Sequence, residues 1–264
     1  MTKLTTESPM TLYTIAMSHY SEKIRWLLDA EGLAYREVAL TPALHVLPAL
    51  LKGRRATTVP LLQIGRETVQ DSTRIIEWLE RQHLLSITLP AARRDEIMAL
   101  EERFDAIGKD VARYLYFAGF AHTDTILAMW TRFASPGQAR VVRIAYPLIK
   151  AVFRAKLDIN AQAAARAERR IGETLAWLEQ RLADGRSHLV GDGLSVADIT
   201  AAALLAPLAC PAEHPVYGAA EFRDRMGRST PALCAWSQRP ALDWVRRMYA
   251  RHRGPVWATL PRCA

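Results

Sequence analysis

The chain has 264 residues, of which 50% are hydrophobic and 23% are charged. This balance excludes a disordered, collagen-like or low-complexity protein, and the length allows one large domain or two of moderate size. The formal net charge is +8. The arginines are scattered among acidic residues and alanines, without a helix-turn-helix or zinc-finger pattern, so we expect no nucleic-acid partner.

The cysteines and histidines indicate neither a disulfide framework nor a metal site. Three cysteines (Cys210, Cys234 and Cys263) cannot all pair, and neither they nor the histidines show metal-ligand spacing. The first residues lack the apolar core of a secretory signal, and polar residues and a proline interrupt the longest apolar run, 196–210. We therefore expect a reduced, cytoplasmic protein with no metal and no membrane partner.

Up to about residue 88, the sequence alternates between strand and helix patterns. Mostly apolar or alternating segments predict strands over 11–17, 35–40, 58–64 and 67–69. Helical spacing predicts one helix that begins at Ser18 and ends at Gly32, and another over 73–81, while 41–52 forms a helix or a loop. The expected order is β-α-β, a connection, and then β-β-α.

From residue 91 onward, strand patterns vanish and helical periodicity takes over. It predicts helices over 91–117, 164–182 and 236–253, and a strongly apolar helix that begins at Ser195. The linker is expected over 86–92, where Pro90 stands. The chain is therefore predicted to contain an α/β domain over 10–88 and an all-helical domain over 92–255.

Ser195 and Asp198 precede the most apolar helix with the spacing of a capping box. In this motif the two side chains accept hydrogen bonds from the free N–H groups at the helix start. We therefore interpret Asp198 as a folding residue and not as a catalyst.

The tetrapeptide Ser18-His19-Tyr20-Ser21 stands between the first predicted strand and its helix. A helix N-terminus stabilises anions through its free N–H groups and its dipole. In a thioredoxin-like β-α-β unit a CxxC motif would stand here, but both cysteine positions are serine, which excludes disulfide exchange by the protein itself. Ser18 either caps the helix or donates a hydrogen bond to a thiolate that a ligand brings.

Two further pairs of residues have both a structural and a functional interpretation. Pro60 follows Val59 at a strand start, where a trans edge proline is the usual case and a cis bond would turn the Val59 backbone toward a ligand. Asp71 and Ser72 open a helix, either as ordinary capping residues or as polar contacts for an amino acid-like ligand.

Taken in order, the segments SHYSEKIRWLL, TVPLL, QDSTRIIEWLE and GDGLSVADI resemble the cytosolic glutathione S-transferases, with a serine-type, zeta- or theta-like first domain. The resemblance implies the glutathione transferase fold, a thioredoxin-like α/β domain followed by an all-α domain. It implies that the first domain binds glutathione, the co-substrate, and that the second supplies most of the pocket for a small hydrophobic electrophile. It also implies a homodimer with a role in detoxification.

In this family resemblance, Ser18 matches the catalytic serine whose hydroxyl holds the glutathione thiolate. A free thiol with a pKa near 8.5 is only a few per cent ionised at neutral pH. One hydrogen bond to a charged group contributes about 1.5–3 kcal/mol and the helix N-terminus about 0.3–1 kcal/mol, which suffices to lower the thiol pKa by about two units. Tyr13 and Tyr20 are the competing candidates, since some transferase classes use a tyrosine.

The same resemblance assigns the other glutathione contacts. Pro60 matches the cis-proline, and the backbone of Val59 pairs with the cysteinyl part of glutathione. Asp71 and Ser72 match the acidic residue and serine that hold the γ-glutamyl ammonium and carboxylate.

The family often places a basic residue or a glutamine near the second helix to bind the glycine carboxylate, and His45 and Arg55 are the candidates here. The stretch 47–58 departs from the family's usual approach to the cis-proline. The electrophile pocket is expected to use aromatic residues of the 91–117 helix, for which the candidates are Phe104, Tyr114 and Phe117. The long basic stretch 118–160 is expected to enlarge or cover this pocket.

Two alternatives to a conjugating transferase remain. One is a non-catalytic module that binds glutathione or a partner without turnover, which the intact Ser18 and Pro60 disfavour. The other is a glutathione-dependent isomerase, dehalogenase or ether-cleaving enzyme on the same fold. The sequence does not distinguish these reactions from conjugation.

Overall fold

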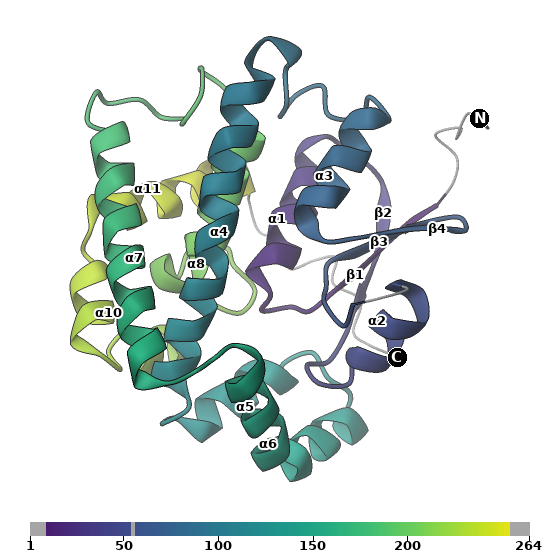
Figure 1. Cartoon of the computed structure of the whole chain (residues 1–264), viewed down its shortest axis with the longest axis vertical. Helices are drawn as coiled ribbons and strands as arrows, with labels where there is room; N and C mark the ends of the chain where they lie inside the picture. The colour runs from purple at the N-terminus through teal and green to yellow at the C-terminus, as the bar shows by residue number, and fades with distance from the viewer. Residues whose placement is uncertain (1–8, 54–55, 254–264) are drawn as a thin grey trace.

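The computed structural model describes residues 9–53 and 56–253, and its first part is built on a small mixed sheet (Figure 1). The strands are β1 (Met10–Thr14), β2 (Tyr35–Ala39), β3 (Leu61–Ile64) and β4 (Glu67–Gln70). They lie in the order β2-β1-β3-β4, in which β1 is parallel to β2 and antiparallel to β3, and β3 is antiparallel to β4. This arrangement confirms the predicted α/β fold of the first part.

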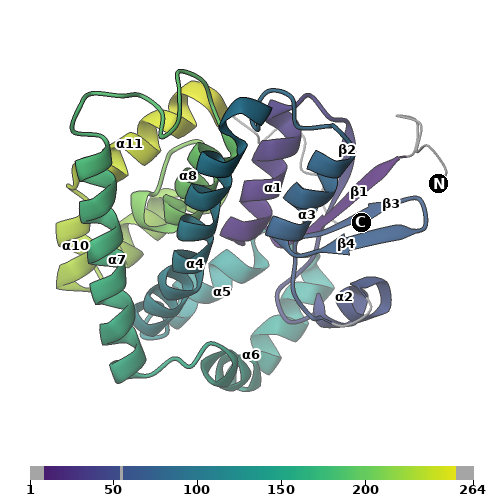
Figure 2. The same ribbon diagram turned by 45° about the horizontal axis from the view of Figure 1, so that its top comes forward.

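Three helices accompany the sheet: α1 (His19–Ala30), α2 (Val46–Gly53) and α3 (Ser72–Arg81). Helices α1 and α3 lie between the sheet and the helices α4 (Arg94–Gly119) and α8 (Val196–Ala209), whereas α2 lies apart from these four helices (Figures 1 and 2). Because the sheet lies on one side of α1 and α8 on the other, even the charged residues Glu22, Lys23 and Arg25 are buried. The connection over 41–52, open in the sequence analysis, contains the helix α2.

The rest of the chain is helical, which confirms the predicted all-α second part. The remaining elements are a 3₁₀ turn (Ala91–Arg93), α4 (Arg94–Gly119), α5 (Thr123–Thr131), α6 (Pro136–Lys156), α7 (Ala161–Arg181), α9 (Ala220–Met226), α10 (Pro231–Trp236), α11 (Pro240–Met248) and a π-helical turn (Tyr249–Arg253). Every residue of α8 is buried, since the helix packs against α1, α4 and α11. A helix that is apolar on all sides belongs in such a core. The predicted end of this domain, residue 255, lies outside the described residues.

The capping box at the start of α8 is present. The Asp198 carboxylate accepts hydrogen bonds from the backbone N–H of Leu189 at 2.7 Å and of Ser195 at 2.9 Å, and from the Ser195 hydroxyl. The side chain of Ser195 accepts in turn from the Asp198 N–H. Asp198 is fully buried.

Replacing Asp198 with alanine is expected to lower the free energy of unfolding by about 1–3 kcal/mol, because buried N–H groups lose their acceptor. Urea unfolding measures this loss, and Asp192→Ala, which alters an exposed carboxylate of the same loop, is the matched control. A loss of activity with unchanged stability would contradict the structural role.

None of the described helices is both long and apolar enough to cross a membrane. Within residues 9–53 and 56–253, no group of three or more His, Cys, Asp or Glu side chains could hold a metal ion.

Candidate functional site

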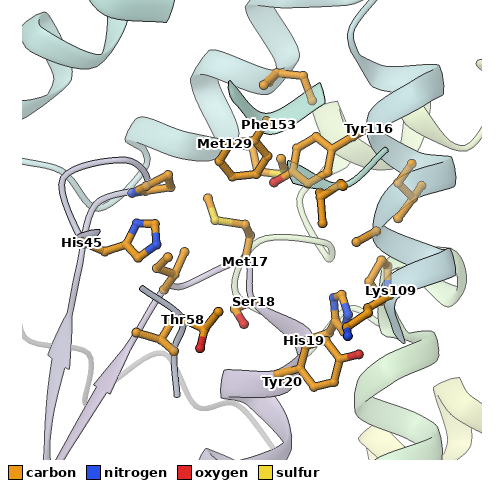
Figure 3. Close-up of a pocket in the computed structure, with 18 of the residues that line it drawn as sticks. Met17, Ser18, His19, Tyr20, His45, Thr58, Lys109, Tyr116, Met129 and Phe153 are labelled. Atoms are coloured by element: carbon orange, nitrogen blue, oxygen red, sulfur yellow. The ribbon is translucent and has the colours of Figure 1, made fainter. Parts of the chain in front are cut away.

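A mostly apolar cavity with a volume of about 230 Å³ lies where the α/β part and the helical part meet. Figure 3 shows Ser18, His45 and Thr58 on one side and Met129, Tyr116 and Phe153 on the other. The first group comes from the α/β part and the second from α4, α5 and α6. The cavity therefore places a polar edge of the first part opposite an apolar wall of the second.

Ser18 stands at the junction of β1 and α1 and lines this cavity. Its backbone is extended, and its Oγ accepts a hydrogen bond from the Ser21 N–H at 3.2 Å. A hydroxyl has one proton to donate as well as lone pairs to accept. The described residues provide no acceptor for that proton, so Ser18 can cap α1 and donate to an anion in the cavity at the same time.

The two tyrosines that compete with Ser18 have their hydroxyl groups engaged elsewhere. Tyr13 does not line the cavity, and its hydroxyl donates to Gln63 Oε1 at 3.1 Å. Tyr20 lines the cavity, but its hydroxyl donates to the backbone oxygen of Asp105 at 3.0 Å. Burial, with the nearby Asp105 charge, raises the pKa of the Tyr20 phenol. Neither phenol is placed to hold a thiolate.

The Val59–Pro60 peptide bond is cis, and Val59 lines the cavity. The carbonyl oxygen of Pro60 accepts from the Asp71 N–H at 3.3 Å, which ties the strand start to the start of α3. Asp71 has a φ of 92°, a conformation that non-glycine residues rarely adopt. Its carboxylate caps α3 by accepting from the N–H groups of Thr73 and Arg74.

Ser72 lies in a buried polar cluster beside the cavity. The Lys23 ammonium group is paired with Glu101, lies 2.8 Å from Asp105 Oδ1 and donates to Ser72 Oγ at 3.3 Å. Ser72 also donates to Asp105 Oδ1 at 3.3 Å. Because Asp105 bonds to the cavity residue Tyr20 as well, the cluster joins the start of α3 to the cavity. Ser72, Asp71 and Pro60 themselves do not line the cavity.

Away from the Ser72 cluster, His45 and Lys156 form another polar part of the cavity wall. His45 is 8% exposed, and its buried Nδ1 has no hydrogen-bond partner among the described residues. Burial, reinforced by the Lys156 charge, lowers its pKa to about 4, so the imidazole is neutral at pH 7. Lys156 donates to Thr57 Oγ1 at 2.9 Å and is therefore the cation on this side. Arg55, the other candidate for this position, lies outside the described residues.

Two sequence models of domain families match this chain. The model described as "Glutathione S-transferase, N-terminal domain" matches residues 12–86, and "Glutathione S-transferase, C-terminal domain" matches residues 161–239. Together the two matches cover more than half of the chain. The chain belongs to the glutathione S-transferase family.

Solved structures of glutathione S-transferases share the fold of this family member. A glutathione S-transferase from Rhodospirillum rubrum F11 is 21% identical, with a TM-score of 0.54 over 89% of this chain and 91% of that one. A beta-etherase from Sphingobium sp. strain SYK-6 is 23% identical, with a TM-score of 0.57 over 90% and 98%. A glutathione S-transferase from Ceriporiopsis subvermispora, solved in complex with glutathione, is 15% identical, with a TM-score of 0.57 over 92% and 96%. No sequence among the curated proteins matches the chain.

The three aromatic residues expected to line the pocket of this glutathione S-transferase family member, Phe104, Tyr114 and Phe117, do not line it. Phe104 and Tyr114 are buried in the core, where the Tyr114 hydroxyl pairs with Thr230, and Phe117 lies on the surface. Tyr116 is the aromatic residue of α4 that lines the cavity. Successive helix positions are turned by about 100°, so the face that Tyr116 presents differs from that of its neighbours.

Residues of the 118–160 segment line the pocket. Ile126 and Met129 of α5 and Phe153 and Lys156 of α6 line the cavity, and so does Leu157. The sequence analysis named this segment but not these side chains. Spacing on one helix shows which residues share a face, but not which face meets the other domain.

Proposed function

We propose that this protein is a serine-type glutathione transferase in which Ser18 stabilises the thiolate of bound glutathione. The observation that carries the proposal is the Ser18 hydroxyl, which faces an apolar cavity from the N-terminus of α1 with its proton free to donate. The N–H groups and the dipole of α1 act on the same point. The thiol proton passes to water, and no side chain has to keep it, because the thiolate is stabilised by the hydrogen bond that Ser18 donates.

The electrophile would bind in the cavity against the apolar wall formed by Tyr116, Met129 and Phe153. The thiolate attacks a carbon of the electrophile, a carbon–sulfur bond forms, and the leaving group departs with the electron pair of its bond to that carbon. The apolar lining of the cavity strengthens the electrostatic stabilisation that Ser18 gives to this step. The cavity volume limits the electrophile to a small molecule.

Glutathione would lie along the edge of the α/β part with its backbone paired to Val59. Its γ-glutamyl carboxylate would bind to the N–H groups at the start of α3 and to the Ser72 hydroxyl, whose proton would turn from Asp105 to this carboxylate, and its ammonium group would pair with Asp71. Asp105 lies 3.3 Å from Ser72 and adds a second carboxylate next to the ammonium position. At the glycine end, neutral His45 would donate a hydrogen bond and Lys156 would supply the charge.

The double variant Asp71→Asn, Ser72→Ala is expected to weaken glutathione binding by about 2–4 kcal/mol, because two polar contacts to charged groups are lost. Asparagine keeps the cap of α3, since its side-chain oxygen still accepts from the N–H groups. Isothermal calorimetry measures the loss, and Asp95→Asn, Ser86→Ala on the exposed surface is the matched control. Unchanged affinity would show that the γ-glutamyl site is misassigned.

A panel of electrophiles separates the remaining reactions. Purified protein is mixed with glutathione and an aryl halide, an alkyl halide, an aryl ether or a double-bond isomerisation substrate, and each product is measured. The fold shared with a beta-etherase makes the aryl ether the second candidate. Binding of glutathione without turnover on any substrate would favour the non-catalytic module.

A homodimer stays a prediction, and a sedimenting species of 29.6 kDa would contradict it.

A further inference from the structure

Large hydrophobic side chains on the surface are concentrated in two segments. Of the eleven that are exposed within residues 9–53 and 56–253, nine lie on or just before α2, or on α6: Leu44, Val46, Leu47, Leu50, Leu51, Val141, Ile144, Leu148 and Val152. The two others, Ile87 and Phe117, lie apart in the sequence. Scattered exposed hydrophobic residues are ordinary, but a concentration of this kind marks an interaction surface.

On α6 the exposed hydrophobic residues form a stripe. Val141, Ile144, Leu148 and Val152 recur at helical spacing, and Ile144 and Leu148 are 74% and 69% exposed. The opposite side of the helix, with Val142 as one example, is buried against the protein. This helix is therefore apolar on two sides, and only one side is covered.

Both ends of α6 are hydrogen-bonded to residues that flank α2. Thr41 Oγ1 donates to Gln138 Oε1 at 3.0 Å before α2, and Lys156 donates to Thr57 Oγ1 at 2.9 Å after it. The two helices lie at the same edge of the molecule (Figure 2). We call the nine residues above the α2–α6 face. The proposed electrophile cavity is lined from both segments, by His45 on one side and Phe153 on the other.

The charge beside this face has one sign. Helix α6 carries five basic and no acidic residues. Arg140, Arg143 and Arg154 are exposed, and none of them pairs with an acidic side chain in the described part of the chain. Two copies of such a helix would repel each other across a symmetric interface, whereas an anionic partner would be attracted.

We propose that the α2–α6 face binds the surface of anionic lipid bilayers. Aliphatic side chains on one side of a helix, with arginines beside them, are the pattern of a helix that lies in the lipid interface. Basic residues near an anionic surface add to the binding. Such peripheral binding needs no membrane-spanning segment, so it departs from the sequence-based expectation of no membrane partner.

Vesicle flotation tests the proposal. The wild-type protein should bind vesicles that contain phosphatidylglycerol, should bind phosphatidylcholine vesicles far less, and should dissociate at high salt. Ile144→Glu should reduce binding to anionic vesicles by about tenfold or more. Ile87→Glu is the matched control, because Ile87 is 62% exposed and lies outside the face.

A second pair of variants tests the charge. The double variant Arg140→Gln, Arg143→Gln should also weaken binding about tenfold or more, and Arg247→Gln, Arg251→Gln on the exposed surface of the C-terminal helices should not. Equal binding of Ile144→Glu and wild type, or equal binding to both lipids, would overturn the proposal. So would a wild-type dimer that Ile144→Glu dissociates in the absence of vesicle binding. Flotation measures no turnover, so its outcome is independent of the proposed transferase activity.

Discussion

Replacing Ser18 with alanine is expected to raise the pKa of the thiol of bound glutathione by about one to two units, equivalent to about 1.4–2.7 kcal/mol. The variant loses the only hydroxyl at the N-terminus of α1 that has a free proton facing the cavity among the described residues. Glutathione affinity should change little, because the other contacts of the peptide remain. Thiolate absorbance of the complex, measured against pH, gives the pKa directly.

Tyr13→Phe and Tyr20→Phe are the controls for this experiment. Both phenols donate to protein oxygens, so their removal should leave the thiol pKa where it is in the wild type. A titration that moves only in Tyr13→Phe or Tyr20→Phe would replace the serine mechanism with a tyrosine mechanism. Each variant keeps the helix N-terminus, which isolates the contribution of the hydroxyl.

Replacing Arg253 with methionine is expected to destabilise the protein by up to about 3–5 kcal/mol, because the buried Glu22 carboxylate loses one of its two arginine partners and keeps only Arg25. Arg253 donates to Glu22 Oε1 at 2.8 Å and to Asp29 Oδ2 at 2.6 Å, and the side chains of Arg253 and Glu22 are 2% and 1% exposed. Chemical unfolding at pH 7 measures the loss. The exposed neighbour Arg251→Met should change stability by less than about 0.5 kcal/mol.

The pH dependence of this loss has a definite sign. Burial alone would raise the pKa of Glu22, but the charges of Arg253 and Arg25 outweigh it and lower the pKa from 4.5 to about 2. A carboxylate with a lowered pKa stabilises the fold above its ordinary pKa, and this contribution is lost as the pH falls from about 4.5 to about 2. The difference between wild type and Arg253→Met should shrink over the same interval. The double variant Glu22→Gln, Arg253→Met should lose less stability than Arg253→Met alone.

Local pattern predicted the elements that position the candidate site. The Ser18 cap, the helix that follows it and the start of α3 at Asp71–Ser72 each depend on a few adjacent residues. The cis bond before Pro60 came from the family resemblance, since an X–Pro bond in a folded protein is usually trans. Features of this kind can be predicted from the sequence because each one depends on residues within a single turn or loop.

The site residues that could not be predicted from the sequence make contacts with residues far away along the chain. Lys23 contacts Asp105 and Lys156 contacts Thr57, and in both cases the partners come from different halves. Helical periodicity places each side chain on a face, but the rotation and position of α4 and α6 against the first part decide which face meets the cavity. For the same reason Tyr116, and not Tyr114, lines the pocket.

The pairing of Arg253 with Glu22 spans 231 positions in the chain. On the ribosome the first part is complete long before Arg253 is made. Until then the Glu22 carboxylate lacks this partner, and its charge opposes the burial of α1. We therefore expect a nascent chain released before Arg253 to hold α1 loosely, open to proteases. The turn at Tyr249–Arg253 would then complete the first domain, and a truncated first domain would be a poor target for separate expression.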